Sequence, residues 1–278
     1  MHKFLRVPIF LGLLFVLFLG CNREILPPPP VNDNIETDQY ILEPHTVNIS
    51  TNLPGFYSAV PGHYYRNNLM YPMLIYIHGA GQFGNGIRPS LDDVFKEGTP
   101  KLLQNKTFPL NFVSGGRHYT FIVLMPQFSR AFTTADMKAF YDYGVSHYRV
   151  DPSRIYLTGF SLGGLMTSEF GSAYPANLAA MLPMAGETTT DLTNKGRNIA
   201  KNKLAVWVFH NDGDQVYNVS GARNFVAAIN AQAPSIPARL TILSPQGLEN
   251  HDAWTRACDP TYKENGMNIY EWMLQYKR

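Results

Sequence analysis

The sequence predicts an α/β fold built around one mostly parallel sheet that is covered by helices on both faces. Near-continuous apolar runs, such as YPMLIYIH at residues 71–78, are typical of parallel strands buried on both faces. Stretches with helical spacing of apolar residues separate the later runs, and this alternation indicates right-handed crossovers between parallel strands. A length of 278 residues and a hydrophobic content of 45% suffice for one large core.

The order of the elements indicates where a functional site would lie. The body is expected to begin near residue 44 with an antiparallel hairpin made of His45 to Thr51 and Gly55 to Ala59. Thr134 is the expected N-cap of a helix over residues 134–148. The other predicted strands are 71–78, 120–125, 154–160, 179–183, 204–210 and 239–243, and the other predicted helices are 91–97, 162–172, 219–231 and 263–276. Ligand sites in such sheets lie at the carboxyl ends of the strands, so functional residues are expected directly after strands.

The N-terminal segment resembles an export signal. Lys3 and Arg6 precede a mostly apolar run over residues 7–20, which is short for a membrane span and is followed by polar and proline-rich sequence. The sequence FLGC at residues 18–21 resembles the lipobox of bacterial lipoproteins, in which cleavage precedes a cysteine that receives lipid. An ordinary secretory signal with a chance cysteine is the alternative. The lipobox interpretation predicts an exported protein, lipid-anchored through Cys21 to the periplasmic face of a bacterial membrane or to the cell surface.

This interpretation divides the chain into a signal segment (1–21), a proline-rich linker (22–43) and a folded body (44–278). Four consecutive prolines in the linker favour an extended, semi-rigid spacer. Cys258 is the only other cysteine, so acylation of Cys21 would exclude an intramolecular disulfide. The net charge of +2 comes from mixed acidic and basic residues with no basic block, which argues against a nucleic-acid partner.

The strongest indication of chemistry is TGFSLGG at residues 158–164, between a predicted strand and a predicted helix. A serine hydroxyl is a weak nucleophile unless it is exposed on a tight turn beside a base, and a strand-turn-helix elbow provides this exposure. Gly159 and Gly163 flank the turn because side chains there would meet the neighbouring backbone. The following helix directs its amide groups at developing negative charge. Ser161 is therefore the candidate nucleophile.

Three segments together resemble a known family. HGAG at residues 78–81, a strand that ends in Pro126-Gln127, and VDPSRIYLTGFSLGG at residues 150–164 resemble the α/β-hydrolase esterases grouped with feruloyl esterases, polyhydroxybutyrate depolymerases and predicted secreted peptidases. The resemblance covers nearly all of the chain after the linker. It implies an α/β-hydrolase fold and a serine mechanism, making residues 44–278 a catalytic domain.

The resemblance also implies the groups that would bind an oxyanion. In this fold the loop after the first buried strand and the residue after the nucleophile contribute backbone amides. The implied donors are Ala80, helped by Gly81, and Leu162. His78 is expected to shape this loop by hydrogen bonding rather than to act as a base.

The acid and the base of a triad should follow the serine in that order. The strand at 204–210 leads into NDGDQV, which resembles the family pattern of His-Gly, two variable residues and Asp. Register on His210 places the acid at Asp214. Asn211 replaces the usual glycine, which keeps Asp212 as the alternative. His251 in ENHDAW follows the last strand and is the predicted base.

These residues predict acyl transfer through a serine acyl-enzyme, with no metal and no cofactor, since the eight histidines are scattered without metal-binding spacing. The resemblance and the expected export favour an esterase that removes acetyl- or feruloyl-type groups from a polysaccharide or an oligosaccharide. The polar segment 186–203 is short, so no large cap domain is expected. Phe128, Phe132 and Trp254 could stack on a substrate or simply pack in the core. The alternatives are a peptidase with the same triad and a carbohydrate-binding lipoprotein without activity.

Overall fold

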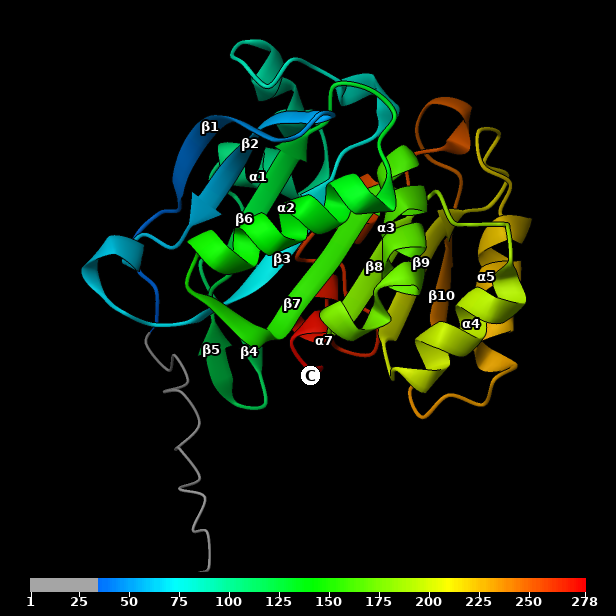
Figure 1. Cartoon of the computed structure of the whole chain (residues 1–278). Helices are drawn as coiled ribbons and strands as arrows, with labels where there is room; N and C mark the ends of the chain where they lie inside the picture. The colour runs from blue at the N-terminus through cyan, green and yellow to red at the C-terminus, as the bar shows by residue number, and fades with distance from the viewer. Residues whose placement is uncertain (1–34) are drawn as a thin grey trace, which may run out of the picture.

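The computed structural model describes residues 35–278, so the predicted signal segment, Cys21 and the proline run lie outside the described residues (Figure 1). Its centre is an eight-stranded sheet with the order β1-β2-β6-β3-β7-β8-β9-β10. Strands β1 and β2 form an antiparallel hairpin, β2 pairs antiparallel with β6, and all pairs from β6 to β10 are parallel. The strands are β1 (Ile41–Ser50), β2 (Leu53–Val60), β3 (Tyr71–Ile77), β6 (Ile122–Gln127), β7 (Val150–Phe160), β8 (Ala180–Met184), β9 (Ala205–Asn211) and β10 (Arg239–Leu243). The predicted mostly parallel sheet with an N-terminal hairpin is confirmed.

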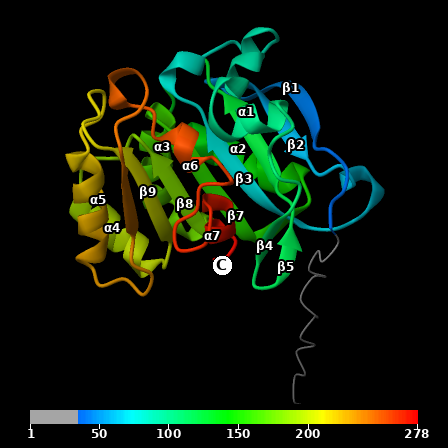
Figure 2. The ribbon, with the colours of Figure 1, turned by 180° about the vertical axis from the view of Figure 1, so that it is seen from behind.

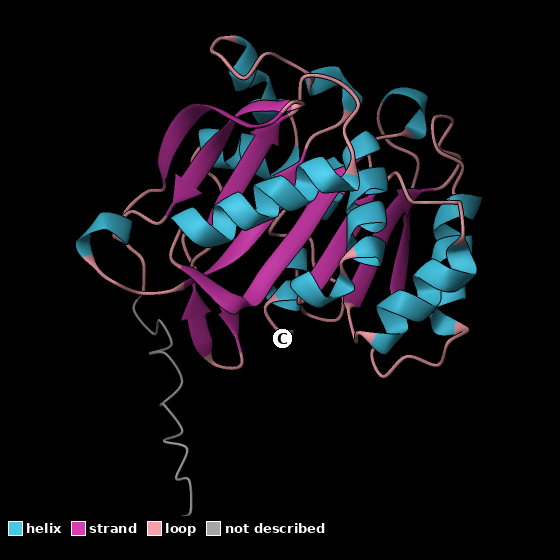
Figure 3. Ribbon diagram, viewed as in Figure 1, coloured by secondary structure: helices cyan, strands magenta, loops and turns pink. Residues whose placement is uncertain are grey.

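Helices cover the sheet on both faces. Helices α2, α3, α4 and α5 lie in front of the sheet in Figure 1, and α1, α6 and α7 lie on the opposite face, which Figure 2 shows. Figure 3 shows the same front layer of helices against the strands. The helices are α1 (Gly98–Gln104), α2 (Thr134–His147), α3 (Leu162–Ala173), α4 (Leu192–Lys201), α5 (Ser220–Asn230), α6 (Trp254–Ala257) and α7 (Ile269–Met273). A separate two-stranded hairpin consists of β4 (Phe112–Ser114) and β5 (Arg117–Tyr119).

The two faces of the sheet form two separate hydrophobic cores. Along β3, Leu74 and Tyr76 pack into the core on one face, while Met73, Ile75 and Ile77 pack into the other. This alternation follows from the two-residue period of a strand, and every residue of β3 is buried. A strand with two buried faces reads as a continuous apolar run, which is why the sequence pattern of β3 could be recognised.

Several predicted elements differ from the structure in detail. The expected helix over 263–276 is only the short helix α7, because Asn268 caps its start by accepting hydrogen bonds from the backbone amides of Tyr270 and Glu271. The expected helix over 91–97 is a 3₁₀ helix, Ser90–Lys96. The N-cap of α2 is Thr133, whose hydroxyl accepts from the Asp136 amide, and not Thr134 as predicted. Short helix α6 was not predicted.

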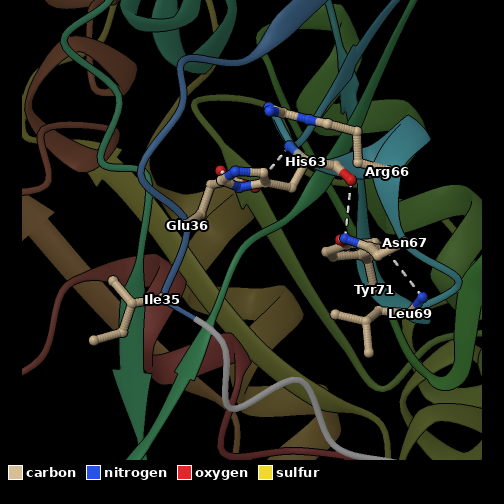
Figure 4. Close-up of a pocket in the computed structure, with 7 residues that line it drawn as sticks. All are labelled: Ile35, Glu36, His63, Arg66, Asn67, Leu69 and Tyr71. Atoms are coloured by element: carbon tan, nitrogen blue, oxygen red, sulfur yellow. Dashed lines mark hydrogen bonds and ion pairs between the residues drawn. The ribbon is translucent and has the colours of Figure 1, made fainter.

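The folded body begins before residue 44. Strand β1 starts at Ile41, so the last residues of the segment predicted as linker belong to the sheet. Upstream, the Glu36 carboxylate accepts hydrogen bonds from the amides of Thr37, Asp38 and His63. Figure 4 shows the surface pocket of about 370 Å³ beside this contact, lined by Ile35, Glu36, His63, Arg66, Asn67, Leu69 and Tyr71. This pocket lies where the described chain begins.

Within residues 35–278, none of the helices has both the length and the apolar character that crossing a membrane requires.

Candidate active site

The strand order places one edge of the sheet at a topological switch point. The chain passes from β3 to its neighbour β6 and then returns across β3 to β7, so the loops after β3 and β7 diverge. Crevices outside the carboxyl ends of such strands are where α/β sheets bind ligands. Each predicted site residue in the described part of the chain follows one of these ends, on the loops after β3, β7, β9 and β10.

Ser161 occupies a strained turn between β7 and α3. Its backbone angles are φ 55° and ψ −122°, which side-chain-bearing residues rarely adopt. Gly159 and Gly163 permit this turn: a Cβ at Gly159 would lie 2.7 Å from the Gly163 carbonyl oxygen, and one at Gly163 would collide with the Ile77 carbonyl oxygen. The Ser161 amide donates to the Met184 carbonyl oxygen at 2.9 Å, which ties the elbow to β8. This is the geometry of a nucleophile elbow.

His251 lies between the serine and an aspartate. Its Nε2 is 2.9 Å from the Ser161 Oγ, and its Nδ1 is 2.8 Å from the Asp214 Oδ2. The His251 side chain is 13% exposed, so the ring is sheltered but reachable from solvent. Trp254 lies edge-on to the ring with centroids 5.2 Å apart, and Tyr217 is nearly parallel to it at 5.9 Å. These aromatic contacts restrict the rotation of the imidazole.

Of the two candidate acids, Asp214 contacts His251 and Asp212 does not. The Asp214 side chain is fully buried, whereas Asp212 is exposed. The Asp214 Oδ1 accepts from the amides of Val216 at 2.8 Å and Tyr217 at 3.0 Å. Two backbone donors on one oxygen leave the other directed at the imidazole, so Asp214 is oriented before any substrate arrives.

Asn211, which stands where the resembling family has glycine, connects the acid loop to the histidine loop. Its Nδ2 donates to the carbonyl oxygens of Gln246 at 3.2 Å and Asn250 at 2.9 Å. The side chain is fully buried, and its Oδ1 has no hydrogen-bond partner within the described residues. The Gln215 amide adds a bond to the Glu249 carbonyl oxygen at 3.0 Å. The departure from the family pattern therefore adds a clamp on the loop that carries His251.

The HGAG segment forms a 3₁₀ turn, Ala80–Gln82, at the end of β3. Ala80 and Gly81 are exposed there, and the Gly79 amide donates to the Gln82 Oε1 at 3.0 Å. His78 shapes this loop, since its Nδ1 lies 2.7 Å from the Gly79 carbonyl oxygen and its Nε2 accepts from the Phe128 amide at 3.0 Å. Burial lowers the pKa of His78 to about 4, so its ring is neutral and suits these two bonds.

The aromatic residues considered for substrate stacking are mainly packing residues. Phe128 and Phe132 stack on each other with centroids 3.6 Å apart and are 0% and 7% exposed. Trp254 packs between Phe160 and His251, and its indole nitrogen donates to a Glu97 oxygen at 3.2 Å. All three serve the core and the orientation of the site.

One buried acidic residue at this edge was not predicted from the sequence. Glu187 follows β8 and is buried, and its carboxylate lies 3.0 Å from the Nδ1 of His210. An acidic residue directly after a buried strand, on the edge that carries the other site residues, is the signal that could have identified it.

A cluster with metal-ligand chemistry lies elsewhere, at the pocket in Figure 4. Glu36 and His63, both labelled in Figure 4, and the nearby Asp38 bring one possible ligand atom each within 4.8 Å of one another. The Glu36 carboxylate already accepts three backbone amides, and Asp38 pairs with Arg66. These contacts satisfy the carboxylates without an ion, so the cluster is explained as an anchor for the start of the body.

Solved structures resemble this chain over most of its length. A thermostable esterase shares 21% identity at a TM-score of 0.58, over 88% of this chain and 64% of its own. A ferulic acid esterase shares 16% identity at a TM-score of 0.54, over 81% of this chain and 97% of its own. A prolyl endopeptidase shares 15% identity at a TM-score of 0.54, over 85% of this chain and 38% of its own. This chain thus spans less than two thirds of the thermostable esterase.

No protein-family model matches the sequence, and no curated protein matches it significantly. The structural similarity, at identities of 21% and below, concerns the fold. It agrees with the strand order, the crossovers and the elbow described above. The chain has the α/β-hydrolase fold.

Proposed function

We propose that this protein is a serine carboxylic ester hydrolase in which Ser161, His251 and Asp214 form the catalytic triad. The observation that carries the proposal is the continuous hydrogen-bonded chain from the Ser161 Oγ through both nitrogens of His251 to Asp214, at 2.9 and 2.8 Å. A serine becomes a useful nucleophile when a base is within hydrogen-bond reach and a third group orients that base. Both conditions are met by the contacts of Ser161 with His251 and of His251 with Asp214.

In the proposed reaction, His251 takes the Ser161 proton as the Oγ attacks the substrate carbonyl carbon. Asp214 holds the imidazole with its Nδ1 proton toward the carboxylate and stabilises the imidazolium that forms. The tetrahedral intermediate collapses as His251 returns the proton to the leaving oxygen. A water molecule, deprotonated by the same ring, then hydrolyses the acyl-enzyme and frees the acid.

The proposed oxyanion donors are the backbone amides of Ala80, Gly81 and Leu162. Leu162 is the first residue of α3, so its amide points out of the helix N-terminus beside the nucleophile. Ala80 and Gly81 lie on the exposed turn that ends β3, the strand paired with β7. Preorganised amides of this kind commonly contribute a factor of about 10² to 10³ to kcat each.

We further propose that the substrate is an acylated carbohydrate bearing acetyl- or feruloyl-type esters. Support comes from the similarity to a ferulic acid esterase and from the segment between β8 and β9, which contains the single helix α4 and no cap domain. Amide hydrolysis is the second candidate, because the same fold and triad geometry suit a peptidase such as the similar prolyl endopeptidase.

Two measurements test these proposals. A fluorophosphonate should label the wild-type protein at Ser161, and Ser161→Ala should abolish both labelling and ester hydrolysis. Asp214→Ala should lower kcat by about 10⁴ because the imidazole loses its orienting partner, while the exposed Asp212→Ala should keep most of the activity. Absence of labelling in folded protein would favour a binding protein without activity, and turnover of peptide amides alone, beside acetate and ferulate esters, would favour the peptidase.

The proposed location is a bacterial membrane, where lipid on Cys21 would anchor the body. The support is the lipobox-like FLGC at residues 18–21. Sensitivity of processing to globomycin, and mass spectrometry of the mature N-terminus, test this proposal. A mature chain that begins at another residue would reject the anchor without affecting the catalytic proposal.

A further inference from the structure

A buried ionisable pair, His210 and Glu187, lies behind the triad and has no role in the mechanism above. Their side chains are 0% and 1% exposed. His210 is near the end of β9, and Glu187 lies in the loop after β8. The His210 Nδ1 is 3.0 and 3.2 Å from the two Glu187 oxygens. The His210 Nε2 is 2.9 Å from the Tyr217 carbonyl oxygen and 3.3 Å from the Asp214 Oδ2.

These contacts determine how many protons the pair holds. A lone pair on the Nε2 would face two acceptors, the Tyr217 carbonyl and the Asp214 carboxylate, so the Nε2 must carry a proton. The contact between the Nδ1 and the Glu187 carboxyl needs another proton, on either side. The pair therefore holds two protons and is neutral overall, either as imidazolium with carboxylate or as imidazole with carboxylic acid.

The surroundings favour retention of both protons. Burial raises the pKa of Glu187. Burial works against a charge on His210, but the hydrogen bond and charge attraction to Glu187 outweigh it, and the pKa of His210 rises.

The His210 Nε2, whose hydrogen bond goes to the Tyr217 carbonyl oxygen, also makes an ion-pair contact of 3.3 Å with the acid of the triad. The Asp214 Oδ1 is held by two backbone amides, and its Oδ2 lies between the His251 Nδ1 at 2.8 Å and the His210 Nε2 at 3.3 Å. Donors on both oxygens fix the rotation of the carboxylate. Since a misplacement of about 1 Å in such a site can cost a factor of 10², this restraint matters for kcat.

Glu187 is fixed by the same backbone that supports the nucleophile. A Cβ on Gly186 would collide with the Ser161 carbonyl oxygen, so the Glu187 loop lies directly against the elbow. The Ala185 amide donates to the Phe209 carbonyl oxygen at 2.9 Å, and the Thr188 amide donates to the Ser168 Oγ at 2.8 Å. The loop is thus bound to β9 on one side and to α3 on the other.

We propose that His210 and Glu187 are positioning residues: Glu187 holds His210 with its Nε2 proton between the Tyr217 carbonyl oxygen and Asp214, and His210 fixes the carboxylate that orients His251. The restraint runs from the loop under Ser161 through Glu187, His210 and Asp214 back to His251. This inference rests on the proposed function, because it assigns a role in the reaction of that site.

Two substitutions at His210 separate this role from simple packing. A glutamine amide lies near the position of the Nε2 and can still donate toward Asp214, whereas an asparagine amide lies near the Nδ1 and reaches only Glu187. We expect His210→Gln to keep kcat within about 5-fold of wild type and His210→Asn to lower kcat by about 100-fold. KM should stay the same in both variants, because neither side chain contacts substrate.

A matched pair at Glu187 tests the other half of the restraint. In Glu187→Gln the amide can donate to the Nδ1 of a neutral imidazole, which keeps the Nε2 proton, so kcat should stay within about 3-fold of wild type. Glu187→Met has a similar length but no polar atom for the Nδ1, and its kcat should fall toward that of His210→Asn. All rates are divided by the fraction of sites that fluorophosphonate labels, which removes the effect of misfolded protein.

A readout besides activity is the nitrogen-15 NMR signal of His210, which should show a protonated Nε2 in the wild type. An unprotonated Nε2, or equal losses of kcat in His210→Gln and His210→Asn after normalisation, would overturn the inference and leave the proposed function intact. Failure of the folded wild type to label at Ser161 would instead overturn the proposed function, and the inference with it.

Discussion

Replacing Asn211 by alanine should reduce activity without reducing stability. The change removes two hydrogen bonds from the Nδ2, to the carbonyl oxygens of Gln246 and Asn250. Such bonds contribute about 1 kcal/mol each, and both carbonyls lie on a loop where water can replace the lost donor. The change also removes the buried Oδ1, which has no hydrogen-bond partner within residues 35–278. Burying such an unpaired acceptor costs the folded state about 1–3 kcal/mol, so its removal is stabilising. These effects offset each other, so unfolding free energy should stay within about 1 kcal/mol of wild type.

The activity of Asn211→Ala should nevertheless fall, because the loop that carries His251 loses its clamp. A fall in kcat of about 10-fold corresponds to a loss of about 1.4 kcal/mol of transition-state stabilisation. The assay is kcat on a chromogenic ester, normalised to fluorophosphonate-labelled sites, together with urea unfolding of the same preparations.

Asn230→Ala is the matched control for Asn211→Ala. Asn230, the last residue of α5, makes a comparable pair of bonds with the backbone of Ala238, at 3.0 and 2.8 Å, just before the start of β10 and so at the opposite end of that strand from the His251 loop. Both of its polar atoms have partners, so its loss should cost about 1–2 kcal/mol of stability and leave kcat unchanged. Wild-type kcat in Asn211→Ala, or a fall in activity that merely follows its folded fraction, would refute the reasoning.

Two further predictions concern the supports of the site. Because burial lowers the pKa of His78 to about 4 while the unfolded chain keeps a value near 6.5, the folded state binds fewer protons, and stability should fall by about 3 kcal/mol as pH drops from 6.5 to 4. In urea unfolding at several pH values, the free energy of unfolding of His78→Asn should depend less on pH than that of the wild type. An unchanged pH dependence of this free energy would contradict a buried neutral ring. Gly163→Ala should lower the free energy of unfolding by about 1–3 kcal/mol and remove most of the activity, because its Cβ would collide with the end of β3. The control is Gly221→Ala, whose Cβ would lie 3.3 Å from a Thr189 methyl. It should change stability and activity only slightly. Equal behaviour of the two glycine variants in thermal unfolding and ester hydrolysis would contradict the steric argument.

The parallel strands were predictable because burial on both faces leaves an unbroken apolar run. The sequence-based range 239–243 for the last strand coincides with β10, and the ranges for β7, β8 and β9 differ from the structure only at their ends. The helix over 263–276 was overestimated because apolar spacing continues through a turn in which Asn268 starts a new helix. Capping by a local side chain decides where such a helix begins, and the periodicity of apolar residues alone does not indicate this position.

The residues of the candidate site could be predicted where they belong to local motifs, and not where they meet only in three dimensions. The elbow around Ser161 and the register from His210 to Asp214 are contiguous patterns, so each could be recognised in the sequence. Glu187 reaches His210 across the ends of two neighbouring strands, 23 positions apart. The partner of a buried side chain across a sheet depends on strand order, which the alternation of strands and helices does not specify.

Three of the residues with strained backbone angles help to explain why so many restraints converge on this edge. Ser161, Ala185 and Glu249 all have positive φ, at 55°, 49° and 56°, and they lie respectively on the elbow, beside Glu187 and on the loop before His251. Such conformations cost about 1–3 kcal/mol each and persist only where the surroundings over-determine them. Each of these residues is held by a different hydrogen bond. The Ser161 amide donates to a carbonyl oxygen of β8, and the Ala185 amide donates to one of β9. The Glu249 carbonyl oxygen accepts from the Gln215 amide, on the loop that carries Asp214. Each of the three strained loops is therefore hydrogen-bonded to a neighbouring strand or loop of the site. A change in the backbone of one loop would displace the others. The distances of 2.8 and 2.9 Å within the proposed triad are a property of this connected edge and not of its three side chains alone.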